Sequence, residues 1–282
     1  MFSRVRAEVV AHSLTRRVRW LALAASALVG AGLAPASALA QLAVDQTEIV
    51  LDPRAVGKRA VSFNVTNFGS EAVQATVYLQ DWSRAADGQQ DFVSSGTLPH
   101  SCGRFLEVFP LSLRLAPGAS GAVRVALTGG DTLTAACWSI IMVESANPAP
   151  PPAGRQIRYV MRIGVKVYVV PPGLAKEGDV LDFTIARHRP DSLADTTGRD
   201  FVVSFQNSGG APLWPTGKIE IRRIDNSVAA TVDIVEFGVL PGDSRTLRVR
   251  IPALPPGHYV ALALIDYGGA EVAGGQVQLD SP

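Results

Sequence analysis

The two cysteines are the residues whose chemistry this sequence constrains most. The chain of 282 residues contains two cysteines and four histidines. Cys102 and Cys137 each precede an apolar run typical of a strand, and no Cys-x-x-Cys motif occurs. A redox or catalytic thiol usually needs such a motif or another thiolate-stabilising environment. In an oxidising compartment the pair would instead form a disulfide. We therefore predict a disulfide between Cys102 and Cys137.

Motifs for catalysis and for metal or cofactor binding are missing from the sequence. It contains no Gly-x-Ser-x-Gly elbow, phosphate loop, His-Glu-x-x-His motif or dinucleotide fingerprint. His100, His188 and His258 are isolated along the chain, and we expect them at the surface or in turns. We predict no enzyme, no catalytic residue, no metal site and no cofactor. Only a site assembled from residues far apart in the sequence would escape this search.

The first 40 residues have the features of a secretory signal. Several arginines precede an apolar stretch at residues 20–33, and Ala38-Leu39-Ala40 is a small-x-small cleavage pattern. We predict a signal peptide over residues 1–40, the general secretory route rather than twin-arginine export, and no membrane span in the mature chain. The formal net charge of +1 gives no argument for a nucleic-acid partner.

The rest of the chain is expected to be all-β. Its 26 glycines and 19 prolines separate short apolar runs, and no segment has a long helical periodicity. We expect two immunoglobulin-like β-sandwich domains, at residues 41–172 and 173–282, with seven strands each. The runs of the first domain are 43–51, 59–67, 72–81, 105–115, 122–128, 137–144 and 156–170. Those of the second domain are 180–187, 201–207, 217–224, 228–235, 245–251, 258–266 and 271–279.

Local patterns recur in the same order in both halves, which favours two copies of one fold over convergent turns. A strand ends in Asn67-Phe-Gly69 in the first half and in Asn207-Ser-Gly209 in the second. A Pro-Gly turn then precedes an apolar-Arg-apolar strand in each, at residues 117–125 and 241–249. Tyr259, which follows Pro-Pro-Gly-His, lies where a tyrosine corner would.

Residues 156–170 form the longest alternating run of the chain. The odd positions are apolar from Ile157 to Val169, and the even positions include Arg158, Arg162 and Lys166. This period of two predicts a strand with one buried face. The run is longer than most strands. It is either an ordinary last strand, or a strand that is partly surplus to its own sheet and available to another protein.

Three segments of the first domain resemble the PapD-like periplasmic chaperones of pilus assembly. Asn67, followed by a strand that closes in Gln80-Asp81-Trp82, is similar to an Asn…Trp segment of that family. Residues 109–118, from Phe-Pro to Ala-Pro-Gly, together with Val123-Arg124-Val125, resemble its next two strands. Residues 165–171 resemble its final strand, with Lys166 five residues before Pro171. The resemblance covers residues 42–172.

This resemblance implies a chaperone that works by strand donation. Family members lend their final strand to an incomplete pilin subunit, which is β-augmentation. The implied donors are Ile157, Tyr159 and Met161, with Ile163 next, and Lys166 would anchor the client's terminal carboxylate. The implied partners are pilin-like or other secreted β-sandwich subunits. Whether an outer-membrane usher is also a partner is left open by the resemblance. The implied compartment is the periplasm of a Gram-negative bacterium.

The sequence departs from the family at the second basic group of the anchor. Where the family has an arginine on the first strand, this chain has Glu48. Either another arginine supplies the charge, for which Arg54, Arg104 and Arg124 are the candidates, or the anchor differs. The main alternative function is an exported structural or adhesion module with two immunoglobulin-like domains that keeps its strand to itself.

Overall fold

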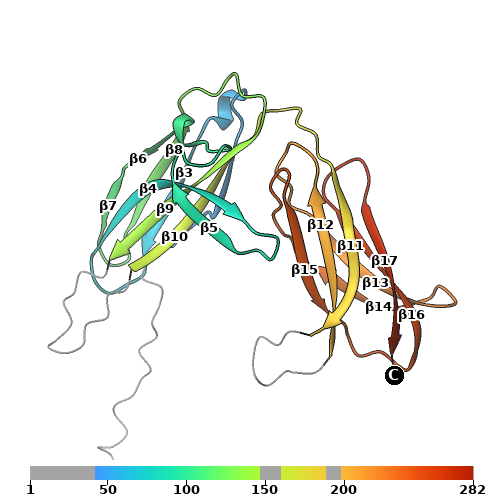
Figure 1. Ribbon diagram of the computed structural model, residues 1–282. Helices are drawn as coiled ribbons and strands as arrows, with labels where there is room; N and C mark the ends of the chain where they lie inside the picture. The colour runs from blue at the N-terminus through green and yellow to red at the C-terminus, as the bar shows by residue number, and fades with distance from the viewer. Residues whose placement is uncertain (1–41, 147–159, 189–197, 282) are drawn as a thin grey trace, which may run out of the picture. The chain divides into compact units, whose positions relative to one another are not determined.

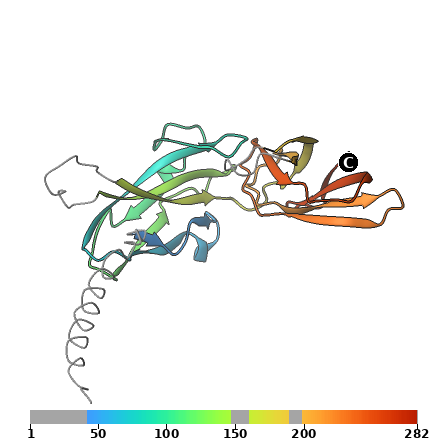
Figure 2. The ribbon, with the colours of Figure 1, turned by 90° about the horizontal axis from the view of Figure 1, so that it is seen from below.

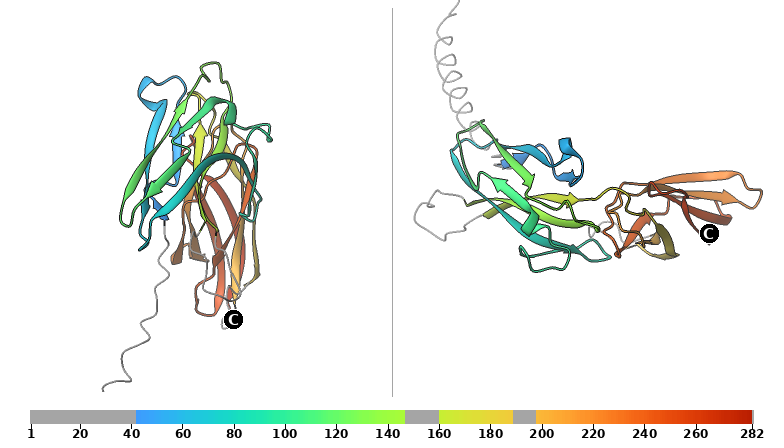
Figure 3. Two further views of the ribbon diagram at one scale, coloured as in Figure 1. Left: turned by 90° about the vertical axis from the view of Figure 1, so that its left-hand side faces the viewer. Right: turned by 90° about the horizontal axis from the view of Figure 1, so that it is seen from above.

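The computed structural model describes residues 42–146, 160–188 and 198–281, and these form two β-sandwiches (Figure 1). The predicted signal peptide lies outside these residues. Each sandwich consists of two facing sheets (Figure 3). Apolar side chains of both sheets pack in the core of each sandwich. The all-β prediction and the prediction of two sandwiches are confirmed. The exact domain boundaries stay a prediction.

The first sandwich has the strand order of an immunoglobulin fold. One sheet runs in the order β1-β3-β8-β6 and the other in the order β2-β10-β9-β4-β5, with β7 paired to the start of β4. These orders correspond to A-B-E-D and A′-G-F-C-C′. The strands of the first sheet are β1 (Leu42–Val44), β3 (Ala60–Asn67), β8 (Ser120–Leu127) and β6 (Leu106–Phe109). Those of the second are β2 (Glu48–Leu51), β10 (Val160–Val169), β9 (Cys137–Ala146), β4 (Val73–Arg84), β5 (Gln90–Ser94) and β7 (Ser112–Leu115).

The prediction of seven strands for the first half is wrong. The described part of this sandwich has ten, because two predicted runs are each divided between the two sheets and β5 is an additional strand. The run 43–51 crosses over between β1 and β2, where Asp45 accepts hydrogen bonds from the backbone N–H and side-chain amide of Asn64. The run 105–115 breaks at Pro110, which has no N–H to donate to a ladder. The polar strand β5 was not predicted.

The second sandwich has seven strands in its described part, all within a few residues of their predicted positions. One sheet contains β11 (Gly178–Arg187), β12 (Arg199–Asn207) and β15 (Ser244–Arg250). The other, in the order β14-β13-β16-β17, contains β14 (Val228–Ile234), β13 (Thr216–Arg223), β16 (Gly257–Asp266) and β17 (Ala273–Ser281). Figure 2 shows β13 and β14 as a long hairpin, drawn in orange. Alternating residues of both sheets, among them Phe201, Val203 and Ile219, fill the core.

Three predictions are confirmed: the disulfide, the tyrosine corner and the two Pro-Gly turns. A disulfide joins Cys102 and Cys137, whose Cα atoms lie 5.2 Å apart. The hydroxyl of Tyr259 donates to the carbonyl of Pro255 at 2.9 Å, as a tyrosine corner does. The turn glycines Gly118 and Gly242 have positive φ, and their N–H groups donate to the carbonyls of the two repeated asparagines.

Candidate functional site: the open edge of the last strand in the first sandwich

Strand β10 has one edge that is paired along its whole length and another that is paired only at its end. All ten residues pair antiparallel with β9. On the other side, β2 pairs in parallel with residues 166–169 only. Among the described residues, no strand covers residues 160–165 on that side. We call this stretch of backbone the open edge.

The backbone polar groups of the open edge can be assigned from the bonds next to it. The N–H of Lys166 donates to the Thr47 carbonyl at 2.9 Å, and the N–H of Val170 donates to Leu51 at 2.9 Å, both toward β2. Because a strand repeats every two residues, the N–H and C=O groups of Arg162 and Gly164 point to the same side. Unpaired groups of this kind are a template for an added strand.

The apolar row of β10 becomes less buried toward the start of the strand. Val165, Val167 and Val169 are fully buried in the core of the first sandwich. Met161 and Ile163 are only partly buried against it. The other two predicted donors, Ile157 and Tyr159, lie outside the described residues. The chain's own core therefore takes the second half of the row completely and the first described half only in part.

The opposite face of β10 carries charged side chains with partners. The Nε of Arg162 lies 2.6 Å from Oε2 of Glu144, which also accepts the hydroxyl of Tyr78 at 2.7 Å. These contacts, Tyr78 first and Arg162 second, hold the pKa of Glu144 below its usual value. Burial and the bond to Glu144 raise the pKa of Tyr78.

Lys166 is paired with an acid on β2. Its Nζ lies 2.7 Å from Oε1 of Glu48, and Glu48 is its register partner on β2. The three arginines considered as a second basic group make contacts elsewhere. Arg54 donates to the Leu133 carbonyl, Arg104 lies over the ring of Phe105, and Arg124 is on β8 in the other sheet.

The sequence did not predict that the aromatic rings of Trp82 and Tyr168 would lie near Lys166. The Nζ of Lys166 lies 5.5 Å from the ring centroid of Trp82, and the guanidinium carbon of Arg84 lies 5.1 Å from the same centroid. Trp82 is fully buried, and its ring meets that of Tyr168 edge to face at 6.1 Å. Cations over an aromatic ring are stabilised by its quadrupole. The Gln80-Asp81-Trp82 pattern predicted the end of this strand, but it did not predict that Lys166 and Arg84 would lie over the Trp82 ring.

A shallow cavity of about 610 Å³ lies on the outer face of the same sheet. Its lining includes Arg162, Gly164 and Lys166 from β10, with Ile140 and Met142 from β9. Gly164 leaves space that Ile140 uses, because a Cβ at this position would come within 2.5 Å of the Ile140 side chain. The rest of the lining is mixed, with Gln80, Gln90, Asp91 and Phe92.

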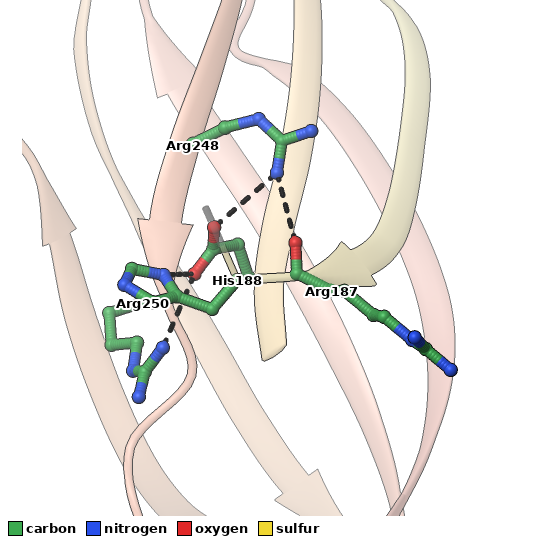
Figure 4. Close-up of polar contacts among 5 residues, drawn as sticks. Arg187, His188, Arg248 and Arg250 are labelled. Atoms are coloured by element: carbon green, nitrogen blue, oxygen red, sulfur yellow. Dashed lines mark hydrogen bonds and ion pairs between the residues drawn. The ribbon is translucent and has the colours of Figure 1, made fainter. Parts of the chain in front are cut away.

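A second polar cluster surrounds a buried acid in the second sandwich (Figure 4). Asp200 on β12 is 2% exposed. Its carboxylate lies 2.6 Å from Nδ1 of His188, 3.4 Å from Nη1 of Arg248 and 4.0 Å from Nη1 of Arg250. Arg248 also donates to the carbonyl of Arg187. A buried carboxylate is tolerated when it is paired in this way, so the cluster joins the ends of three strands.

His188 lies just after the end of β11, and its side chain is 16% exposed. Sequence spacing did not reveal Asp200, because a single acid in a strand looks like a solvated residue. In the described part of the chain, no group of three or more His, Cys, Asp or Glu side chains is arranged to hold a metal ion. Within the same ranges, no helix is long and apolar enough to cross a membrane.

Comparisons with known proteins find similarity in structure only. No family model matches the sequence, and no curated protein matches it. The class 5 fimbriae chaperone CfaA is 13% identical with a TM-score of 0.45, over 86% of this chain and 99% of that chain. The E. coli chaperone DraB is 16% identical with a TM-score of 0.40, over 85% and 98%. A chain from the complex of the Salmonella enterica SafA pilin with the SafB chaperone is 14% identical with a TM-score of 0.44, over 86% and 99%.

Proposed function

We propose that this chain is a periplasmic chaperone that binds incomplete β-sandwich subunits by lending them β10. The observation that carries the proposal is the open edge. Residues 160–165 are held firmly on the β9 side and have no strand on the other side within the described ranges. A rigid strand with one free edge can accept a partner strand without unfolding its own sheet, which is the requirement for β-augmentation.

The apolar row supports the same function through its side chains. Donors with alternate spacing would fill an open groove in the client, and burying one Val, Ile or Met side chain contributes about 1.5–3 kcal/mol. The row is free to do so only where its own core does not already bury it. The proposed donors are those that the resemblance implied, Ile157, Tyr159 and Met161, with Ile163 next. Of these, Met161 and Ile163 lie within the described residues and are partly buried against the core.

The clients are pilin-like or other secreted β-sandwich subunits, which an outer-membrane usher would receive for assembly. The mechanism is stoichiometric capture and release, so it requires no nucleotide, metal or catalytic residue. Alternation sets the register, because a slip of one residue would turn every donor side chain away from the client. Lys166, for which the resemblance implied a carboxylate anchor, lies at the closed end of the open edge.

A pull-down from periplasmic extract tests the proposal. The bait is the exported chain as wild type, as Tyr159→Asp, and as Leu181→Asp. The third is a matched control, because Leu181 is an exposed apolar residue of the second sandwich, 58% accessible. We expect a small exported β-protein to be retained by wild type and Leu181→Asp and lost with Tyr159→Asp. Equal retention by all three baits would refute the donor assignment.

A further inference from the structure

The open edge of β10 ends at an ion pair made by the chain itself. Lys166 is the first residue of β10 to pair with β2, and its partner Glu48 is the first residue of β2. The bond from the Lys166 N–H to the Thr47 carbonyl closes the edge at this point. A client strand laid along residues 160–165 would therefore terminate beside Glu48 and Lys166.

The charge of Lys166 is already satisfied. Its Nζ lies 2.7 Å from the Glu48 carboxylate, the length of a charge-assisted hydrogen bond. The two side chains are 18% and 31% exposed, so Glu48 is the more accessible partner. Burial and the nearby Glu48 carboxylate also raise the pKa of Tyr168, the next outward-facing residue of β10. The other oxygen of Glu48, Oε2, accepts the Nε1–H of Trp214 at 2.7 Å. The closed end therefore presents a neutralised ion pair to a client.

A terminal carboxylate of the client would meet an acid at this point. It would share one ammonium with Glu48, and two carboxylates around one cation repel each other. The nearest cation along β10, Arg162, is paired with Glu144 at 2.6 Å. The crossover next to Glu48 carries a further exposed acid, Asp45. Arg84, from β4, lies over the same Trp82 ring as Lys166, and its Nη1 donates to the carbonyl of Gly238 at 2.9 Å.

We infer that Glu48 permanently occupies the position of a client carboxylate, so that this chain captures its client through the strand edge without binding the client's chain end. The inference rests on the proposed strand-lending function and names the specificity residue of that site. The client class that fits is a β-sandwich subunit whose chain continues beyond the captured groove. A subunit that depends on its terminal carboxylate for capture is disfavoured.

The test compares two forms of one client. The probe is the exported protein that the wild-type chain retains from periplasmic extract, produced with its own C-terminus and with a Gly-Ser-Gly extension. Dissociation constants are measured by calorimetry for wild type, Glu48→Gln and Glu107→Gln. Glu107→Gln is the matched control, because it removes an exposed acid on β6 in the other sheet.

For wild type and for Glu107→Gln, the dissociation constants of the two client forms should agree within about twofold. Glu48→Gln keeps the side-chain size and releases the charge of Lys166. It should therefore prefer the free terminus by about tenfold, the scale of one charge-assisted hydrogen bond.

Two results would overturn the inference: a tenfold preference for the free terminus in wild type, or no preference in Glu48→Gln. Failure of the proposed function looks different, because wild type would then retain no exported protein. The inference would fall with it.

Discussion

The two sandwiches share a buried asparagine network at the end of one strand, and they differ in their last strand. Asn67 at the end of β3 donates from Nδ2 to the carbonyls of Glu71, Leu115 and Ala116 and accepts the Gly69 N–H at 2.9 Å. At the end of β12, Asn207 donates to Ala211 and Val239 and accepts the Gly209 N–H at 3.0 Å. The repetition of one buried network in the same place shows that the two halves share one architecture.

The last strands are built differently. In β17 the exposed positions are Gly274, Gln276, Gln278 and Asp280, and its inward row includes Ala273 and Gly275. A Cβ on Gly275 would meet Val180 and Phe183, so β11 packs closely over this strand. In β10 the inward row is uniformly large and apolar, and half of one edge is open. β17 also has an unpaired edge within the described residues, because it pairs only with β16. What distinguishes β10 is its row of large apolar side chains, which suits it to fill a groove in another protein.

The largest expected effect on stability comes from the disulfide, which only the first sandwich has. Replacing Cys102 and Cys137 by serine removes a link across 35 residues. The loop-entropy account predicts a loss of about 3–4 kcal/mol in the free energy of unfolding. Hydrogen exchange followed by mass spectrometry should show this loss in peptides of the first sandwich and no change in β11–β17. Equal loss in both sandwiches would show that they do not unfold independently.

The shared asparagine network predicts equal losses of stability in the two sandwiches. Asn67→Ala and Asn207→Ala each leave buried carbonyls without their donor and should each destabilise their own sandwich by about 2–3 kcal/mol. The measurement is again hydrogen exchange resolved by sandwich. A large loss for one variant and none for the other would mean that the two networks are not equivalent.

Much of the fold could be predicted from local patterns. Every strand of the second sandwich has apolar residues with a period of two between turn residues, and turn chemistry marked Asn67, Asn207 and Tyr259. Period two does not say to which sheet a residue belongs. That is why the crossover at residues 45–47 and the break at Pro110 were missed. The strand β5, Gln-Asp-Phe-Val-Ser, has too few apolar residues to show a period.

The site was predictable in part. The length and alternation of residues 156–170 indicated an unusual strand, and comparison with the chaperone family marked Glu48 as a departure. The pairing of Glu48 with Lys166 depends on the parallel register of β2 against β10, which joins residues 118 apart in the sequence. The open edge depends on the same register. Neither property is encoded within a single stretch of sequence.

A smaller effect is expected at the tyrosine corner of the second sandwich. Tyr259→Phe removes the bond to the Pro255 carbonyl and leaves the buried ring in place. The loss in the free energy of unfolding should be about 1 kcal/mol, the usual value for one hydrogen bond. Denaturant melts of the variant and wild type measure it. Unchanged stability would mean that water satisfies the carbonyl equally well.

The smallest effect is the pH dependence of the β10 side of the first sandwich. The pKa of Glu144 is lower in the folded chain than its ordinary value. Its contribution is therefore present above the ordinary carboxyl pKa of about 4.3 and is lost as the pH falls through the lower folded value. Because the pair is partly exposed, the contribution is about 0.5 kcal/mol.

Glu144→Gln should show less acid destabilisation between pH 5 and pH 3 than wild type in thermal melts. Tyr78→Phe, which removes the main cause of the pKa shift, should behave like Glu144→Gln over this range. Identical acid profiles for wild type and both variants would contradict the pKa assignment.

The open edge itself can be tested with one residue. The N–H of Arg162 points away from β9, so Arg162→Pro removes a donor of the open edge without breaking the β9 ladder, as proline is tolerated on strand edges. Arg162→Ala is the matched control, because it loses the bond to Glu144 and keeps the N–H. We expect Arg162→Ala to retain the exported client and Arg162→Pro to lose it, with both variants folded by circular dichroism. Equal capture by the two would contradict strand lending through β10.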